Sequence, residues 1–94
     1  MSGPNFTSIF WDGDDDPQGN VQHIAAGHDL TTEEVEDVFR NPTGRGWSRS
    51  SGKPVIFGET RTGRYIMVVY NRIDASTVRP ITAYDVPRPG RKRP

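Results

Sequence analysis

Two histidines are the side chains of this chain best suited to moving protons at neutral pH. His23 and His28 titrate near neutrality, so either can accept or donate a proton without a large pKa shift. Tyr70 and Tyr84 are weaker candidates for the acid. Each histidine also has a structural interpretation, in which His23 makes a helix–sheet contact and His28 caps a turn.

Basic residues of the second half of the chain could bind a phosphodiester and stabilise the charge that develops when it is cleaved. Arg79 and Arg64 complete the candidate catalytic set with the histidines, because a planar guanidinium can hold two phosphate oxygens and stabilise charge that develops there. We predict that Arg61, Arg64 and Arg79 converge on one exposed face near the loop 49–53. The candidate RNA-binding residues, which offer phosphate contacts and one stacking surface, are Arg49, Lys53, Arg61 and Trp47. Packing in the core or in an interface is the alternative role for Trp47.

The charges of the chain are segregated along its length. Residues 1–47 contain nine acidic and two basic side chains, giving −7, and residues 48–94 contain three acidic and ten basic ones, giving +7. Folding can neutralise the two halves, with Arg79 for example paired to Glu59 or Asp74. Alternatively, an acidic helical face lies opposite a basic sheet that meets phosphate.

No metal ion or cofactor is expected. The acidic run that begins at Asp12 has the spacing of a calcium loop, but Pro17 stands where that loop needs glycine and His23 where it needs glutamate. The two histidines are five residues apart, so they would lie on different faces of a helix. Around Lys53 the glycine spacing is wrong for a phosphate-binding loop, and a proline follows the lysine.

The sequence pattern predicts an α+β fold that would position these residues. It consists of a short N-terminal strand, two helices, and then a three-stranded antiparallel meander packed on the helices. Thr31 and Glu34 form a capping box for the second helix, which ends at Asn41–Pro42. The Gly-, Ser- and Arg-rich stretch 43–53 predicts a loop that can contain a short strand around Trp47. The remaining predicted elements are the strand 7–11, the helix 17–26 and the meander strands 55–60, 65–70 and 78–84, with 65–70 central.

The length of 94 residues predicts a single domain with a thin core. We expect an N-terminal extension over 1–8, the α+β domain over 9–86, and a disordered basic tail rich in proline and glycine over 87–94. The absence of cysteine, of an apolar span and of signal-peptide features predicts a cytoplasmic protein without membrane contact. A thin core without disulfides favours a protein partner or a homodimer.

The order of several short motifs resembles the BrnT family. These motifs are Trp11-Asp12 after an opening strand, Asn20 on the next helix, Gly27-His28 at a turn, Glu33-Glu34-Val35 with Val38-Phe39, and a last strand running from Val78 to Tyr84. The resemblance spans about residues 9 to 84. BrnT proteins are toxins of type II toxin–antitoxin pairs whose fold is similar to RelE-type ribonucleases, so the resemblance implies a bacterial RNA-cutting toxin and a cognate antitoxin partner.

The sequence also departs from that family. The arginine that usually ends the last strand is replaced by Tyr84, and Pro87 and Pro89 exclude the closing helix. We therefore expect a metal-independent endoribonuclease toxin whose activity these losses would weaken. Two alternatives stay open: a non-catalytic module that binds RNA or protein on the same fold, and a dimerising structural domain.

Overall fold

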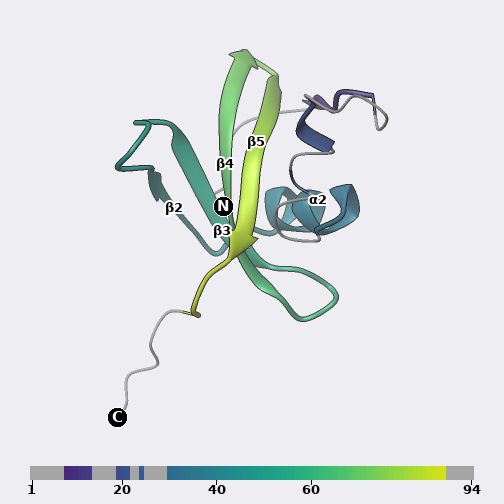
Figure 1. The fold of residues 1–94 in the computed structure, drawn as a ribbon, viewed down its shortest axis with the longest axis vertical. Helices are drawn as coiled ribbons and strands as arrows, with labels where there is room; N and C mark the ends of the chain where they lie inside the picture. The colour runs from purple at the N-terminus through teal and green to yellow at the C-terminus, as the bar shows by residue number, and fades with distance from the viewer. Residues whose placement is uncertain (1–7, 14–18, 22–23, 25–29, 89–94) are drawn as a thin grey trace.

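The computed structural model describes residues 8–13, 19–21, 24 and 30–88. Its central feature is a five-stranded sheet that carries helix α2 on one face (Figure 1). The strand order is β1-β5-β4-β3-β2, so β4 is the central strand. In chain order the elements are β1 (Ser8–Ile9), α2 (Thr32–Arg40), β2 (Gly44–Trp47), β3 (Pro54–Glu59), β4 (Tyr65–Asp74) and β5 (Thr77–Asp85).

The predicted arrangement of two helices and a three-stranded meander was wrong. The described residues form a five-stranded mixed sheet, in which β1 pairs in parallel with β5, and α2 is the helix whose bounds they define. The stretch 43–53 was predicted to be a loop that can contain a short strand around Trp47, and that strand is β2; Gly44 and Gly46 disfavour strands, but pairing with β3 overrides that preference. Of the expected helix 17–26, only 19–21 and 24 are described, and Asn20, Val21 and Ile24 have helical backbone.

The predicted capping box and C-terminal end of α2 are confirmed. The backbone N–H of Glu34 donates to Thr31 Oγ1 at 3.1 Å, and the backbone N–H of Thr31 donates to Glu34 Oε1 at 3.0 Å, which completes the capping box. The helix ends at Arg40, and Asn41 caps it by donating its N–H to the carbonyl of Asp37. None of the helices in the described part of the chain is long and apolar enough to cross a membrane.

The predicted antiparallel pairing of the last three strands is confirmed. Val55 pairs with Val69 and Glu59 with Tyr65, which fixes the β3–β4 hairpin around a turn at Gly63, whose φ is 91°. β5 pairs with β4 from Ile66 outward, and the register shifts twice, between Val69 and Tyr70 and between Arg72 and Asp74. β4 is therefore hydrogen-bonded on both sides, as its nearly continuous apolar sequence predicts.

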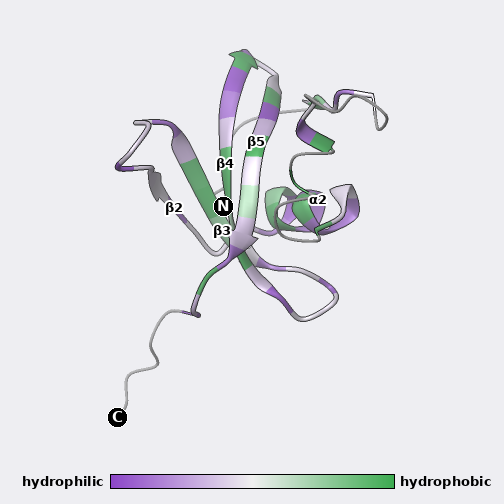
Figure 2. Cartoon of the chain, in the orientation of Figure 1, coloured by the Kyte–Doolittle hydropathy of each residue, from purple (hydrophilic) through white to green (hydrophobic). Residues whose placement is uncertain are grey.

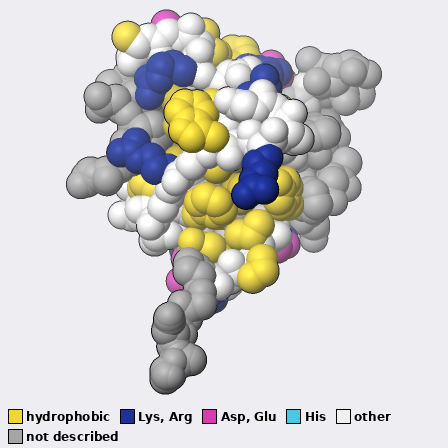
Figure 3. Space-filling view, turned by 90° about the vertical axis from the view of Figure 1, so that its left-hand side faces the viewer, with side chains coloured by type: hydrophobic (Ala, Val, Ile, Leu, Met, Phe, Trp, Pro, Cys, Tyr) yellow, Lys and Arg dark blue, Asp and Glu magenta, His cyan; other side chains and the backbone are white. Residues whose placement is uncertain are grey.

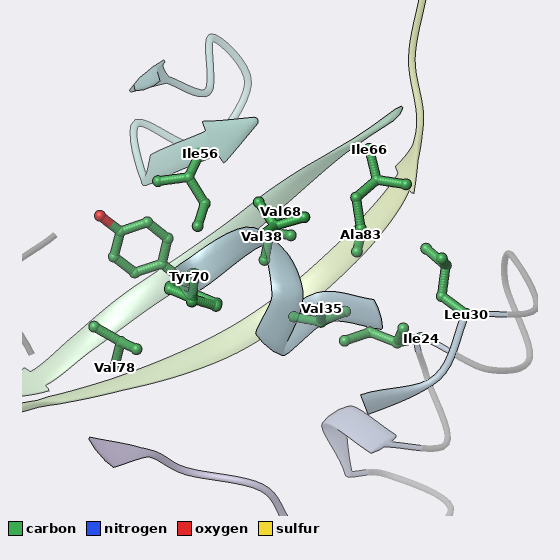
Figure 4. Close-up of a cluster of buried hydrophobic side chains, with 11 residues drawn as sticks. Ile24, Leu30, Val35, Val38, Ile56, Ile66, Val68, Tyr70, Val78 and Ala83 are labelled. Carbon is green, nitrogen blue, oxygen red and sulfur yellow. The ribbon is translucent and has the colours of Figure 1, made fainter. Parts of the chain in front are cut away.

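The core lies between α2 and one face of the sheet. Alternate residues of β4, namely Ile66, Val68 and Tyr70, belong to one buried cluster with Val35 and Val38 of α2, and Val68 lies beside Val38 (Figure 4). Figure 2 shows hydrophobic segments gathered where the middle of the sheet faces the helix. The remaining buried members of this cluster are Ile24, Leu30, Phe39, Ile56, Val78 and Ala83.

Gly58 on β3 allows α2 to approach the sheet closely. A Cβ atom at this position would lie 3.1 Å from Val38 Cγ1 and 3.2 Å from the carbonyl oxygen of Asn41. Both distances are shorter than ordinary van der Waals contact, so the end of α2 would have to move away from β3 to accept any larger residue.

Asn20 ties the N-terminal segment to β5. Its amide nitrogen donates to the carbonyl oxygens of Phe10 at 3.0 Å and of Pro80 at 2.9 Å, and its Oδ1 accepts the backbone N–H of Asp12 at 2.8 Å. The side chain is only 3 % exposed, so these bonds satisfy polar groups that water does not reach freely. Asn20 thereby holds β1 and the following helical residues against the sheet.

Candidate nucleic-acid interface

The predicted RNA-binding residue Arg61 is held by an acid of α2. Its Nη2 lies 2.8 Å from Oδ1 of Asp37, and its backbone N–H donates to the other oxygen of the same carboxylate at 3.1 Å. Arg40 donates to Asp37 as well, at 2.7 Å. These hydrogen bonds, led by the side chain of Arg61, lower the pKa of Asp37 to about 2. Arg61 therefore has an intramolecular anion where RNA phosphate was expected.

Arg64, a predicted catalytic residue, is paired in the same way. Its Nη2 lies 2.7 Å from Oδ2 of Asp85, and its Nη1 lies 3.7 Å from Oε1 of Glu34. The hydroxyl of Thr62 donates to the second oxygen of Glu34 at 2.6 Å. Hydrogen bonds from Thr62 and Thr31 and the charge of Arg64 outweigh burial, and together they lower the pKa of Glu34.

Arg79, the other predicted catalytic arginine, binds Asp12. Its Nη2 lies 2.6 Å from Oδ2 of Asp12, and this oxygen also accepts the backbone N–H of Asn20 at 2.8 Å. The N–H of Asn20 and the guanidinium of Arg79 lower the pKa of Asp12. Arg79 thus joins the set of contacts that fastens the N-terminal segment to β5.

The predicted convergence of these arginines was wrong for the hairpin pair. Lys53 comes before the first residue of β3, whereas Arg61 and Arg64 follow its last residue. A strand of this length separates its ends by about 20 Å at 3.3 Å per residue. The hairpin arginines and the loop 49–53 therefore lie at opposite ends of the sheet and cannot contact one phosphate.

His23 and His28 lie outside the described residues. The described residues contain no group of three or more His, Cys, Asp or Glu side chains that could hold a metal ion.

A different set of basic residues is left without carboxylate partners in the described part of the chain. Every described arginine on α2, the hairpin, β5 and the segment after it makes an ion pair. The basic residues with no ion pair among the described residues all belong to β2, the β2–β3 loop and the far half of β4; they are Arg45, Arg49, Lys53 and Arg72. Figure 3, which views the side of the molecule where β2 lies, shows Lys and Arg side chains gathered around exposed hydrophobic ones.

Strand register explains why two of these arginines share a surface with aromatic residues. Arg45 pairs with Ile56 and Trp47 pairs with Pro54, so their side chains lie on the face of the sheet that carries the buried Ile56. On β4, Tyr70 and Arg72 follow the same alternation. α2 covers this face near Gly58, and the β2 end of the face extends past the helix.

These side chains line a pocket of about 500 Å³. Trp47 is 73 % exposed and offers a flat aromatic surface at its rim. Arg72 is fixed at the β4–β5 turn by donating to the carbonyl oxygen of Ala75 at 3.1 Å. We call this the β2 pocket; its lining residues are Arg45, Gly46, Trp47, Pro54, Val55, Tyr70 and Arg72.

Tyr70 connects the β2 pocket to the core. Its ring packs edge-on against Phe39 with centroids 5.3 Å apart, whereas its hydroxyl points away from the hydrophobic cluster (Figure 4). No hydrogen bond joins this hydroxyl to another residue in the described ranges. Burial raises the pKa of Tyr70, and the charges of Arg72 and Arg45 counteract part of that effect. The phenol is therefore protonated at neutral pH and is a proton donor beside two cations.

Sequence reasoning named Trp47 and considered Tyr70, but it missed Arg45 and Arg72. The signal was present as alternation: Arg45 and Trp47 are two residues apart, as are Tyr70 and Arg72, so each pair shares one face of its strand. This alternation could not reveal the shared surface as long as the pairing of the glycine-rich stretch, as β2, with β3 was unknown.

No family model matches the chain, and no curated protein and no solved structure matches it either.

Proposed function

We propose that this chain binds single-stranded RNA in the β2 pocket. The observation that carries the proposal is the grouping of the basic residues that lack ion pairs among the described residues around the exposed indole of Trp47. Single-stranded nucleic acid is bound by aromatic side chains that stack on bases and by basic side chains that track the phosphates. The resemblance to BrnT toxins favours RNA as the nucleic acid.

Salt dependence tests the phosphate contacts. Arg45 and Arg72 line the pocket, and Arg49 and Lys53 lie in the adjoining β2–β3 loop. If all four contact phosphates, the slope of log Kd against log salt should reach about 3 for single-stranded RNA. Fluorescence anisotropy with a labelled oligonucleotide measures this slope. Arg45→Ala should lower it by about 0.7, whereas Arg88→Ala should not, because Arg88 pairs with Glu59 outside the β2 pocket.

The stacking contact has a test of its own. Trp47→Ala should weaken binding about 5- to 150-fold, the usual range for loss of one stacked base. Phe10→Ala is the matched control, because Phe10 is also exposed, at 44 %, but does not line the β2 pocket. Equal losses in the two variants, or no binding by a folded wild-type protein, would refute the proposal and leave a protein-binding module or a dimerising domain as the alternatives.

RNA cleavage is the second candidate function, and the placement of Tyr70 favours it. In metal-independent cleavage the 2′-oxygen attacks the adjacent phosphorus and loses its proton to solvent, the bond to the 5′-oxygen breaks, and that oxygen takes up a proton. Tyr70 would donate this proton, and Arg45 and Arg72 would stabilise the charge on the phosphorane. The expected products carry 2′,3′-cyclic phosphate ends.

Tyr70→Phe separates cleavage from binding. The substitution keeps the aromatic ring against Phe39 and removes only the hydroxyl, so folding and RNA affinity should change little. Cleavage in the presence of EDTA should fall by about 100-fold or more. A protein that binds RNA but yields no cyclic-phosphate ends would be a binding module, and unchanged cleavage by Tyr70→Phe would exclude Tyr70 as the acid.

A further inference from the structure

β2 forms the outer edge of the described sheet, next to β3 alone. The N–H of Ser48 donates to the carbonyl of Lys53 at 2.7 Å, in register with the pairing of Gly46 and Val55. In an antiparallel pair, alternate residues direct their backbone groups toward the partner strand, so Gly46 faces β3 as Ser48 does. The intervening residues, Arg45 and Trp47, direct their N–H and C=O groups away from the sheet.

The side chains along this edge favour an acidic partner strand. Arg45 and Trp47 both project on the face that bears α2, whereas the opposite face of β2 carries only the hydrogen atoms of Gly44 and Gly46. Arg49 and Lys53 extend the positive charge past the end of the strand, and no described carboxylate pairs with either of them. An added strand would meet cations and one aromatic ring on one face and no β2 side chain larger than hydrogen on the other.

We propose that an extended, acidic segment of a partner protein adds to β2 as a sixth strand. Its backbone would pair with the outward N–H and C=O groups of Arg45 and Trp47. An acidic side chain would face Arg45, and a β-branched or aromatic side chain two residues away would face Trp47. Arg45 and Trp47 also line the β2 pocket, so the segment and RNA would compete for it. This competition rests on the proposed RNA binding, whereas the addition of the strand is independent of it.

A second copy of this chain fits the edge less well. Two β2 strands paired with each other would bring Arg45 of one copy near Arg45 of the other, together with the loop cations. Like charges facing one another across strands are destabilising. Charge therefore selects an acidic partner over self-association through this edge.

The probe is a capped synthetic peptide, Thr-Glu-Thr-Val-Thr-Glu-Thr-Val-Thr, which alternates glutamate and valine on one face of an extended chain. Binding is measured by isothermal calorimetry on the full-length protein, using Arg45→Ala and Arg45→Pro as a matched pair. Both variants lose the guanidinium, but only proline removes the outward N–H and blocks the edge. Arg45→Pro should therefore bind the peptide at least tenfold more weakly than Arg45→Ala, and the wild-type protein should bind most tightly.

A second measurement avoids any effect of proline on folding. The same peptide, N-methylated at alternate residues so that it cannot pair with an edge, should fail to bind the wild-type protein, as should a version with lysine in place of glutamate. Equal affinities for the methylated and unmethylated peptides would overturn the proposal. So would sedimentation showing a wild-type dimer that Arg45→Pro, but not Arg45→Ala, dissociates. Both variants lack the guanidinium, so their affinities for RNA should be equal although their affinities for the peptide differ. Peptide binding and RNA binding are measured separately, so either proposal can fail while the other stands.

Discussion

Replacing Asn20 with leucine should cost this domain much of its stability. Leucine has a similar size but removes the hydrogen bonds to the Phe10 and Pro80 carbonyls and from the Asp12 N–H, leaving buried polar groups without these partners. At about 1 kcal/mol for each lost hydrogen bond, the free energy of unfolding should fall by about 3 kcal/mol. For a domain of this size that corresponds to a decrease in Tm of about 15 °C.

Urea and thermal unfolding, followed by circular dichroism, measure this loss. Asn71→Leu is the control, because Asn71 is half-buried on β4 and makes no hydrogen bond through its side chain within the described ranges; its effect should stay within about 0.5 kcal/mol. Hydrogen exchange at the amides of Phe10 and Asp12 should quicken in Asn20→Leu before the amides of β4 are affected. A loss below about 1 kcal/mol in Asn20→Leu would refute the role assigned to this residue.

The other stability predictions concern Asp37 and Gly58. The pKa of Asp37 is lowered to about 2 in the folded protein, so its ion pairs stabilise the fold above the unfolded pKa of about 4, and this contribution disappears as pH falls toward 2. In Asp37→Asn, acid unfolding curves should lack that part of the pH dependence; an unchanged dependence would contradict the ion pair with Arg61. Gly58→Ala should destabilise the domain by about 1–3 kcal/mol in urea unfolding, because the new methyl group meets Val38 and the Asn41 carbonyl. Gly46→Ala, whose methyl would meet only Val55 at 3.9 Å, should cost clearly less, and equal losses would argue against the close helix–sheet approach.

Features set by neighbouring residues could be predicted from the sequence. The capping box at Thr31 and Glu34 and the β3–β4 hairpin at Gly63 depend on interactions within a few residues, and both are present. The pairing of β1 with β5 depends on residues far apart in the chain, and two residues of strand carry too little pattern to reveal it. A short strand around Trp47 was foreseen within the predicted loop, but the glycines of β2 gave no sign that it pairs with β3, and this pairing outweighs their low strand preference.

The candidate site was predicted less well, because the sequence shows that acidic and basic residues are segregated but not which acid pairs with which arginine in the fold. The acids of the first half and the arginines of the second half meet in the fold: Asp37 with Arg61, and Asp12 with Arg79. The neutralisation that charge segregation allowed is therefore realised for these arginines. Arg45, the last basic residue of the acidic half, keeps its charge unpaired among the described residues.

The parallel pairing of β1 with β5 affects how the chain can fold during translation. Ser8 and Ile9 leave the ribosome early, but their partners Thr77 and Val78 are synthesised only after β2, β3 and β4. The hairpins of the middle strands can form as they emerge, since their contacts are local. The N-terminal segment cannot dock until β5 has been synthesised, and until then the apolar side chain of Ile9 lacks its β5 neighbour. Docking of this segment should therefore be the last folding step, and slowed translation of β5 would prolong the exposed state.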